Sequence, residues 1–141
     1  GYIRASKRVD PKEWFFDAHF YQDPVCPGSL GIESFLQMLR FFMIRRYDIK
    51  PGTCTAAMPA GQSHEWVYRG QIIPANKKVV IHAHIRSAEE SEGTYRVTAD
   101  GALLVDGICI YEMKNFSYEM GKNTADLPLT PSEEKEEPSA P

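Results

Sequence analysis

The chain has 141 residues, of which 43% are hydrophobic and 25% charged, the composition of one soluble globular domain. Its net charge of −3 arises between residue 122 and the C-terminus, where two lysines oppose five acids, so the other 14 basic and 14 acidic residues balance. This neutral body excludes the basic surface that nucleic-acid binding requires, and no run of 18 apolar residues predicts a membrane span.

The cysteines suggest a reducing environment. Cys26, Cys54 and Cys109 are an odd number without CxxC spacing, which favours neither a disulfide framework nor a structural zinc site. The N-terminal residues lack the apolar core of a signal peptide. We therefore expect a cytoplasmic location.

One short strand and one long helix are expected in the first third of the chain. Residues 2–9 alternate loosely between apolar and polar side chains, which predicts a strand. Pro27 and Gly28 begin a predicted helix that continues to about Tyr47. Its apolar positions leave hardly any polar face, and this pattern predicts a helix that is buried on all sides.

Strands alone are expected after this helix. Asp106 and Gly107 separate two apolar runs and strongly predict a hairpin. One long helix with a largely antiparallel sheet gives an α+β fold, with the sheet either curled around the helix or carrying it on one side of four strands. The predicted strands comprise residues 63–73, 77–88, 94–105 and 108–119.

Two parts of the chain differ in composition. Residues 1–120 form the predicted domain, whereas residues 121–141 are rich in Pro, Ser and Glu and poor in apolar side chains. Such a segment cannot bury enough surface to offset its ordering entropy, so we expect a disordered tail. Such a tail is typical of a linker in a longer multidomain chain. The alternative interpretation is an ordinary frayed terminus.

A histidine and a carboxylate are the candidate reactive groups. His19 lies between Phe16 and Phe20, and Glu33 follows 14 residues after it, at the start of the predicted helix. A neutral imidazole and a carboxylic acid in one apolar site can remove a proton at one carbon and protonate a leaving hydroxyl at the next. Each also has a simpler interpretation, the histidine as a core residue and Glu33 as a structural acid.

Other residues with reactive side chains have simpler interpretations. His82 and His84 share one face of a predicted strand and could be metal ligands, but no third ligand is evident, and we expect a solvated face. Cys26 precedes Pro27 and could be a reactive thiol. We expect it to be a small apolar filler.

Three segments, taken in order, resemble one known family. IRASKRVDPKEWFFDAHF (residues 3–20), HFYQDPVCPGSLGIESFLQ (19–37) and ADGALLVDGICIY (99–111) resemble the β-hydroxyacyl-acyl carrier protein dehydratases of the hotdog fold. The similarity extends over residues 1–119 and is to the FabA-like branch, found in bacterial unsaturated-fatty-acid synthesis and in polyunsaturated fatty acid synthases. The resemblance implies a single hotdog fold, a sheet wrapped around a central helix.

The resemblance also implies roles for individual residues. His19 matches the catalytic base and Glu33 the catalytic acid of the family. The backbone carbonyl of Val25 would hold the imidazole in the right tautomer, and the Gly28 N–H would bind the thioester oxygen. Gln37, one helical turn after Glu33, would orient the carboxyl group. We expect Glu33 to be buried by its apolar neighbours and to carry a proton.

The resemblance further implies a carrier-bound substrate and a second hotdog unit. In this family the histidine and the carboxylate of one site come from two adjoining units, which implies a homodimer or a pseudo-dimer. No metal or other cofactor is implied. The bacterial enzyme that also isomerises has Asp where this chain has Glu33, and Cys where it has Ser29, so isomerisation stays open. The alternatives are a hotdog thioesterase and a non-catalytic half of a pseudo-dimer.

Overall fold

The computed structural model describes residues 1–122 of the chain. The predicted tail, residues 121–141, lies outside this range apart from its first two residues. These two belong to the last strand, β6 (Ile108–Lys122), which therefore extends past the predicted domain boundary.

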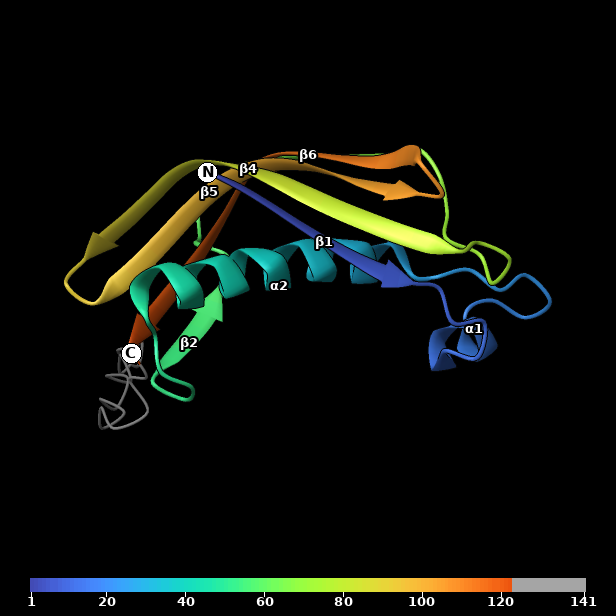
Figure 1. Cartoon of the computed structure of the whole chain (residues 1–141), viewed down its shortest axis with the longest axis horizontal. Coiled ribbons are helices and arrows are strands. Elements are labelled where there is room, and N and C mark those ends of the chain that lie inside the picture. Colours follow the sequence, from blue (N-terminus) through green and yellow to red (C-terminus); the bar gives the residue numbers. More distant parts are fainter. Residues whose placement is uncertain (123–141) are drawn as a thin grey trace, which may run out of the picture.

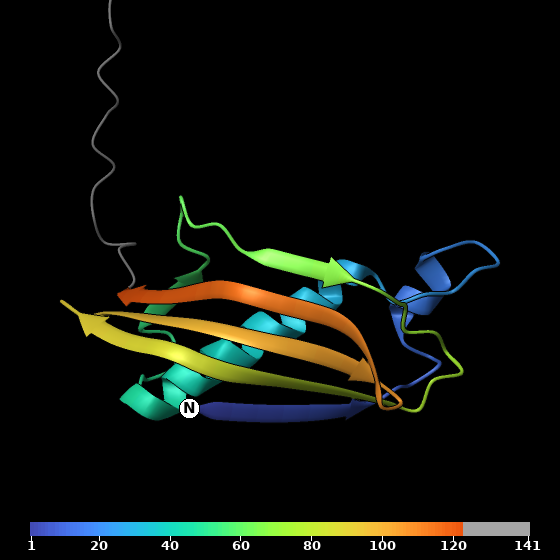
Figure 2. The same ribbon diagram turned by 90° about the horizontal axis from the view of Figure 1, so that it is seen from above.

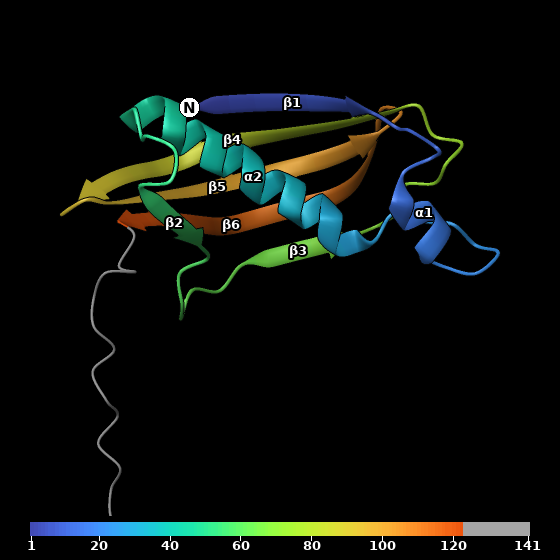
Figure 3. The same cartoon turned by 90° about the horizontal axis from the view of Figure 1, so that it is seen from below.

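One long helix, α2 (Gly28–Tyr47), lies across the concave face of a curled antiparallel sheet (Figures 1 and 3). The α+β class is confirmed, but the alternative of four strands is wrong, because the described residues form a six-stranded sheet. The strand order is β1-β4-β5-β6-β2, and β3 pairs with another part of β6, so β1 and β3 lie at opposite edges (Figure 2). The remaining strands are β1 (Tyr2–Arg8), β2 (Cys54–Ala57), β3 (Glu65–Tyr68), β4 (Lys78–Ser91) and β5 (Thr94–Val105).

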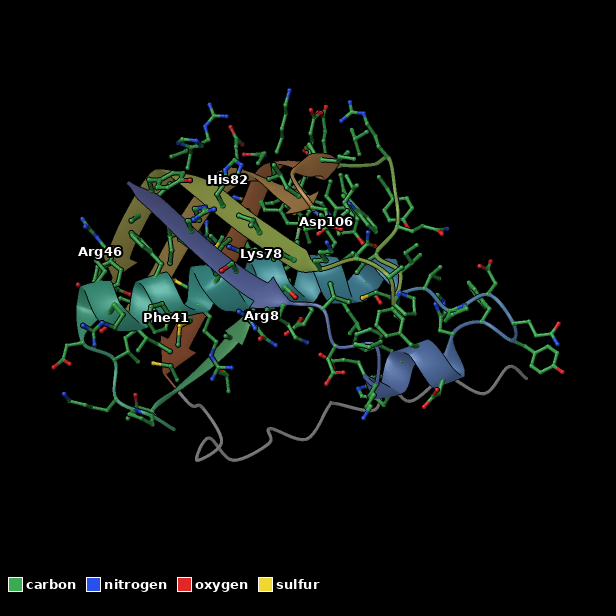
Figure 4. The ribbon with its side chains drawn as sticks, turned by 45° about the vertical axis from the view of Figure 1, so that its right-hand side comes forward. Arg8, Phe41, Arg46, Lys78, His82 and Asp106 are labelled. Carbon is green, nitrogen blue, oxygen red and sulfur yellow. The ribbon has the colours of Figure 1, made fainter. Side chains whose placement is uncertain are left out.

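Tight turns set the register of the three long strands. Asp106 and Gly107 both have positive φ, as a two-residue hairpin turn requires, and the predicted hairpin is confirmed. The Asp106 carboxylate accepts hydrogen bonds from the backbone N–H groups of Lys77 and Lys78 at 3.0 and 2.9 Å (Figure 4). These backbone hydrogen bonds, together with the Asn76 amide, lower the pKa of Asp106. The side chain therefore joins the start of β4 to the end of β5.

Two glycines allow α2 to approach the sheet closely. A Cβ atom at Gly31 would lie 2.2 Å from the ring of Tyr111 on β6, and one at Gly101 would lie 2.3 Å from the ring of Phe35 on α2. Tyr111 and Phe35 are fully buried, so neither ring has free space to retreat into. The two contacts fix the distance of α2 from β5 and β6, and Tyr111 also fixes its first turn.

The helix is not buried on all sides, contrary to the sequence prediction. Its buried residues include Phe35, Leu36 and Leu39, which face the sheet. Glu33, Gln37, Arg40 and Phe41 recur at helical spacing on the opposite side and are exposed, Phe41 to 57%. Figure 4 shows the position of Phe41 on α2. None of the described helices has the length and apolarity needed to cross a membrane.

Two short elements were not expected from the sequence. They are α1 (Trp14–Ala18), which lies beyond the N-terminal end of α2, and the edge strand β2 (Figure 1). The predicted strand 63–73 is only four residues long in the structure, as β3. Short elements carry little periodic signal, because a pattern needs more than one turn or two alternations to be recognised.

We expect Gly31→Ala to lower the free energy of unfolding by about 1–3 kcal/mol, because the added methyl group overlaps the buried ring of Tyr111. Urea denaturation of both proteins measures the difference. Ser29→Ala in the same first turn is the control, because Ser29 is exposed and alanine favours a helix. Equal stability of Gly31→Ala and wild type would contradict the importance of this contact.

Candidate active site

His19 follows α1 and is held by a pair of hydrogen bonds to Val25. The Val25 N–H donates to the backbone carbonyl of His19 at 2.7 Å, and His19 Nδ1 lies 3.0 Å from the carbonyl oxygen of Val25. Val25 itself is buried, and the next residue, Cys26, donates its N–H to the Ile72 carbonyl at 2.8 Å. The loop that carries the imidazole is thus closed on itself and joined to the segment before β4.

The hydrogen bond to Val25 determines which ring nitrogen of His19 is free. A carbonyl oxygen only accepts, so Nδ1 must carry the proton and donate it. In the neutral ring Nε2 then keeps its lone pair, which is the arrangement of a general base. The ring packs against Phe20, with centroids 3.7 Å apart. The contact with Val25 has the geometry that the resemblance implies.

Gly28 is the first residue of α2, and Pro27 precedes it as a cap without a side-chain hydrogen bond. The first N–H groups of a helix have no partner inside the helix and lie at its positive end. The Gly28 carbonyl accepts a hydrogen bond from the Tyr111 hydroxyl at 3.1 Å, which fixes this turn. An oxygen that gains negative charge is well matched to such a helix N-terminus.

Glu33 and Gln37 lie together on the exposed side of α2. The Gln37 amide Nε2 donates to Glu33 Oε1 at 3.1 Å, so this pairing also has the expected geometry. The expected burial of Glu33 is wrong for the single chain, because its side is turned away from the sheet. Successive helical residues are rotated by about 100°, so apolar neighbours such as Phe35 do not cover it.

One chain does not bring His19 and Glu33 together. Within residues 1–122, Glu33 and Gln37 line a cavity of about 320 Å³, whereas His19 is not part of its wall. The hydrogen bond that the His19 ring makes in this part of the chain is the one to Val25. The candidate groups therefore belong to two separate pairs in the described residues: His19 with Val25 and, on α2, Glu33 with Gln37.

An aromatic cluster beside Gly28 was missed in the sequence. Trp66 and Tyr68 of β3 pack against Tyr111 with ring centroids 5.4 and 5.1 Å apart. A Cβ atom at Gly28 would lie 3.4 Å from Trp66. Burial raises the pKa of both Tyr68 and Tyr111, which keeps their hydroxyl groups protonated. The signal in the sequence that could have revealed this cluster is the pair of aromatic residues, Trp66 and Tyr68, at alternate positions of a short strand.

The other reactive side chains have structural surroundings. His82 lies on the outer face of the sheet (Figure 4), and His84, two residues further along β4, shares that face. Within residues 1–122 no three His, Cys, Asp or Glu side chains form a metal cluster. Burial lowers the pKa of His82 and raises that of Cys26. A buried thiol that keeps its proton is a poor nucleophile, which favours the interpretation of Cys26 as an apolar filler.

Comparisons with known proteins agree with the sequence resemblance. A family model described as a FabA-like domain matches residues 1–114. One subunit of the polyunsaturated fatty acid synthase of Thraustochytrium sp. (strain ATCC 26185 / S-3) is 38% identical over 82% of this chain. The match covers only 8% of that relative, so the chain corresponds to a small part of it.

Solved structures of a thioesterase have the same fold. A mutant of the fluoroacetyl-CoA-specific thioesterase FlK has a TM-score of 0.60 and 12% identity, covering 86% of this chain and 84% of that one. The same mutant in complex with fluoroacetate and CoA has a TM-score of 0.58 and 14% identity, covering 86% and 90%. At this identity the likeness shows the fold alone, and the expected hotdog fold is confirmed.

We expect neutral His19 to carry its proton on Nδ1, because this nitrogen faces the Val25 carbonyl. A long-range ¹H–¹⁵N correlation spectrum of the folded protein distinguishes the two ring nitrogens. The exposed His84 provides an internal reference in the same spectrum, and His19→Gln assigns the signals. A spectrum in which Nε2 of His19 carries the proton would exclude it as the base in this geometry.

Proposed function

The chain belongs to the FabA-like family, and we propose on this basis that it dehydrates β-hydroxyacyl thioesters held on an acyl carrier protein to trans-2-enoyl thioesters. The observation that carries the proposal is the free Nε2 of His19, left by the hydrogen bond from Nδ1 to Val25. The family and the identity to part of a fatty acid synthase support this class of reaction.

In the proposed reaction His19 acts first. Its Nε2 takes a proton from C2 of the substrate, and the electron pair of that bond delocalises onto the thioester oxygen. The Gly28 N–H, at the positive end of α2, binds this oxygen as its charge develops. Loss of one such donor typically raises a barrier by about 3 kcal/mol.

Glu33 completes the elimination. Its carboxyl group gives a proton to the C3 hydroxyl, the C3–O bond breaks and water leaves as the C2–C3 double bond forms. The Gln37 amide holds one carboxyl oxygen, so the other is free to point at the hydroxyl group. The atoms balance: the substrate loses one hydrogen from C2 and one hydroxyl from C3, and no redox step is needed.

A second hotdog unit is part of the proposal. The two reactive groups of one chain lie in separate halves, and Glu33 is exposed until another unit covers it. Trp66 and Tyr68 expose 41% and 43% of their surface on β3, an edge strand beside Gly28, which supports an interface there. We infer a homodimer, or a pseudo-dimer with a hotdog unit elsewhere in a longer chain.

The setting of the reaction is also a proposal. The relative's name supports a role in fatty acid or polyunsaturated fatty acid synthesis. A role in polyketide synthesis, and the carrier protein as the partner that delivers substrate, are part of the proposal. The three cysteines are all free, which fits the cytoplasm. The proposed reaction uses protein groups, namely the side chains of His19 and Glu33 and the backbone N–H of Gly28, and calls for no cofactor.

We expect the wild-type protein to hydrate an enoyl thioester, the reverse of the proposed reaction, and His19→Ala to lose at least about 10²-fold in kcat, because the base is removed. Loss of the enoyl absorbance in the ultraviolet measures turnover, and a thiol reagent measures hydrolysis in the same samples. Thiol release would favour a thioesterase. No turnover by a folded wild-type dimer would favour a non-catalytic hotdog unit.

We expect inactive His19→Ala and inactive Glu33→Gln chains to complement each other. A purified mixed dimer has one site with both groups intact and should recover about half of the wild-type activity. Differently tagged copies allow the mixed dimer to be isolated, and a dimer that combines two His19→Ala chains is the control. Failure of a verified mixed dimer to regain activity would mean that both groups act within one chain.

A further inference from the structure

The hydroxyl group of Tyr111 reaches the first turn of α2 from the sheet. Tyr111 lies on β6, its side chain is 1% exposed, and its hydroxyl group donates a hydrogen bond to the Gly28 carbonyl at 3.1 Å. A buried hydroxyl group needs a partner. Here the partner belongs to the residue whose N–H group the proposed reaction uses, so the hydroxyl group is in a position to act on that reaction through the backbone.

Two hydrogen bonds hold the peptide groups on either side of Gly28. The Pro27 carbonyl accepts one from the Leu30 N–H at 3.0 Å, and the Gly28 carbonyl accepts the one from Tyr111. A trans peptide group is planar, and its N–H points opposite to its carbonyl. Holding the Pro27 carbonyl therefore directs the Gly28 N–H, and holding the Gly28 carbonyl directs the N–H of Ser29.

The Tyr111 ring is held in place from several sides. Gly31 of α2 is so close that a Cβ atom there would lie 2.2 Å from the ring, and Trp66 and Tyr68 pack against it with centroids 5.4 and 5.1 Å away. Burial raises the pKa of Tyr111, so its hydroxyl group stays a donor throughout the pH range in which a histidine titrates. A donor that is fixed before substrate binds meets the condition for electrostatic preorganisation.

Resting on the proposed function, we propose that Tyr111 is a positioning residue for the thioester oxygen of the substrate. Its hydroxyl group holds the peptide between Gly28 and Ser29, so that the N–H groups of both residues keep a fixed direction out of the start of α2. The hydrogen bond also polarises that peptide, which makes the Ser29 N–H a stronger donor. Tyr111 touches neither the substrate nor the groups that transfer protons.

The test is Tyr111→Phe, which removes one oxygen atom and keeps the ring that contacts Gly31. The backbone N–H groups remain but lose a fixed direction. We therefore expect kcat for enoyl hydration to fall about tenfold, which is less than the loss of a whole donor. KM should change by less than about twofold, because a contact that strengthens in the transition state alters kcat. The pH profile of kcat/KM should keep its shape, because His19 is unchanged.

Tyr47→Phe is the matched control. Tyr47 lies at the other end of α2 and packs against Tyr95 of β5 with ring centroids 4.7 Å apart, so the same oxygen atom is removed from a helix–sheet contact far from Gly28. It should leave kcat unchanged, and melting temperatures show whether both variants fold. Should Tyr111→Phe not fold, Tyr111→Met removes the hydroxyl group and fills the space with an adaptable side chain.

A spectroscopic measurement separates this proposal from the proposed reaction. Octanoyl-CoA with ¹³C at the thioester carbon has neither a double bond nor a C3 hydroxyl group, so infrared spectroscopy follows its carbonyl without dehydration. Binding to the wild-type dimer should lower the carbonyl stretching frequency, and Tyr111→Phe should lose most of that shift.

The outcomes differ for the two proposals. Loss of the shift in Tyr111→Phe, in a protein without dehydratase activity, would support the positioning role and refute the reaction. Equal shifts and equal kcat in wild type and Tyr111→Phe would overturn the positioning role and leave the reaction standing. Binding of octanoyl-CoA to wild type without any shift would also overturn the positioning role.

Discussion

The contact between Tyr111 and Gly31 is the constraint on which the rest of the structure depends. A ring that is fully buried on β6 meets a position of α2 that tolerates no Cβ atom, and the same ring's hydroxyl holds the Gly28 carbonyl. One side chain therefore fixes both the distance of the helix from the sheet and the rotation of its first turn. The rotation decides which residues face the sheet and which face outward. The N–H groups at the start of α2, and the side chains one turn later, have defined directions as a result.

That rotation explains why the two candidate groups belong to separate parts of one chain. With Phe35 and Leu39 turned toward the sheet, Glu33 and Gln37 must lie on the outer side of α2. The His19 loop is held by different contacts, those to Val25 and through Cys26 to Ile72. Within residues 1–122, the contacts that hold the His19 loop are therefore separate from the helix that carries Glu33. In the proposed dimer, a second unit supplies the missing group and covers Glu33.

The sequence predicted the long regular elements well, but it did not predict which side of α2 faces the sheet. The helix from Gly28 to Tyr47 and the Asp106-Gly107 hairpin follow from local signals, a Pro-Gly start and a turn that needs positive φ. The contacts of His19 with Val25 and of Glu33 with Gln37 were expected from a family resemblance. The exposure of Glu33 was not expected, because the number of apolar residues along α2 does not show which side of the helix faces the sheet. Trp66 and Tyr68 were overlooked because β3 has only four residues.

The cavity beside Glu33 follows from the shape of the sheet. The sheet curls over α2, but β1 runs at one edge, and short α1 rather than a further strand closes the space beyond the first turns of the helix (Figure 3). The short helix is positioned by the ion pair between Lys7 and Glu13 and by the side chain of Phe16, which is buried in the core.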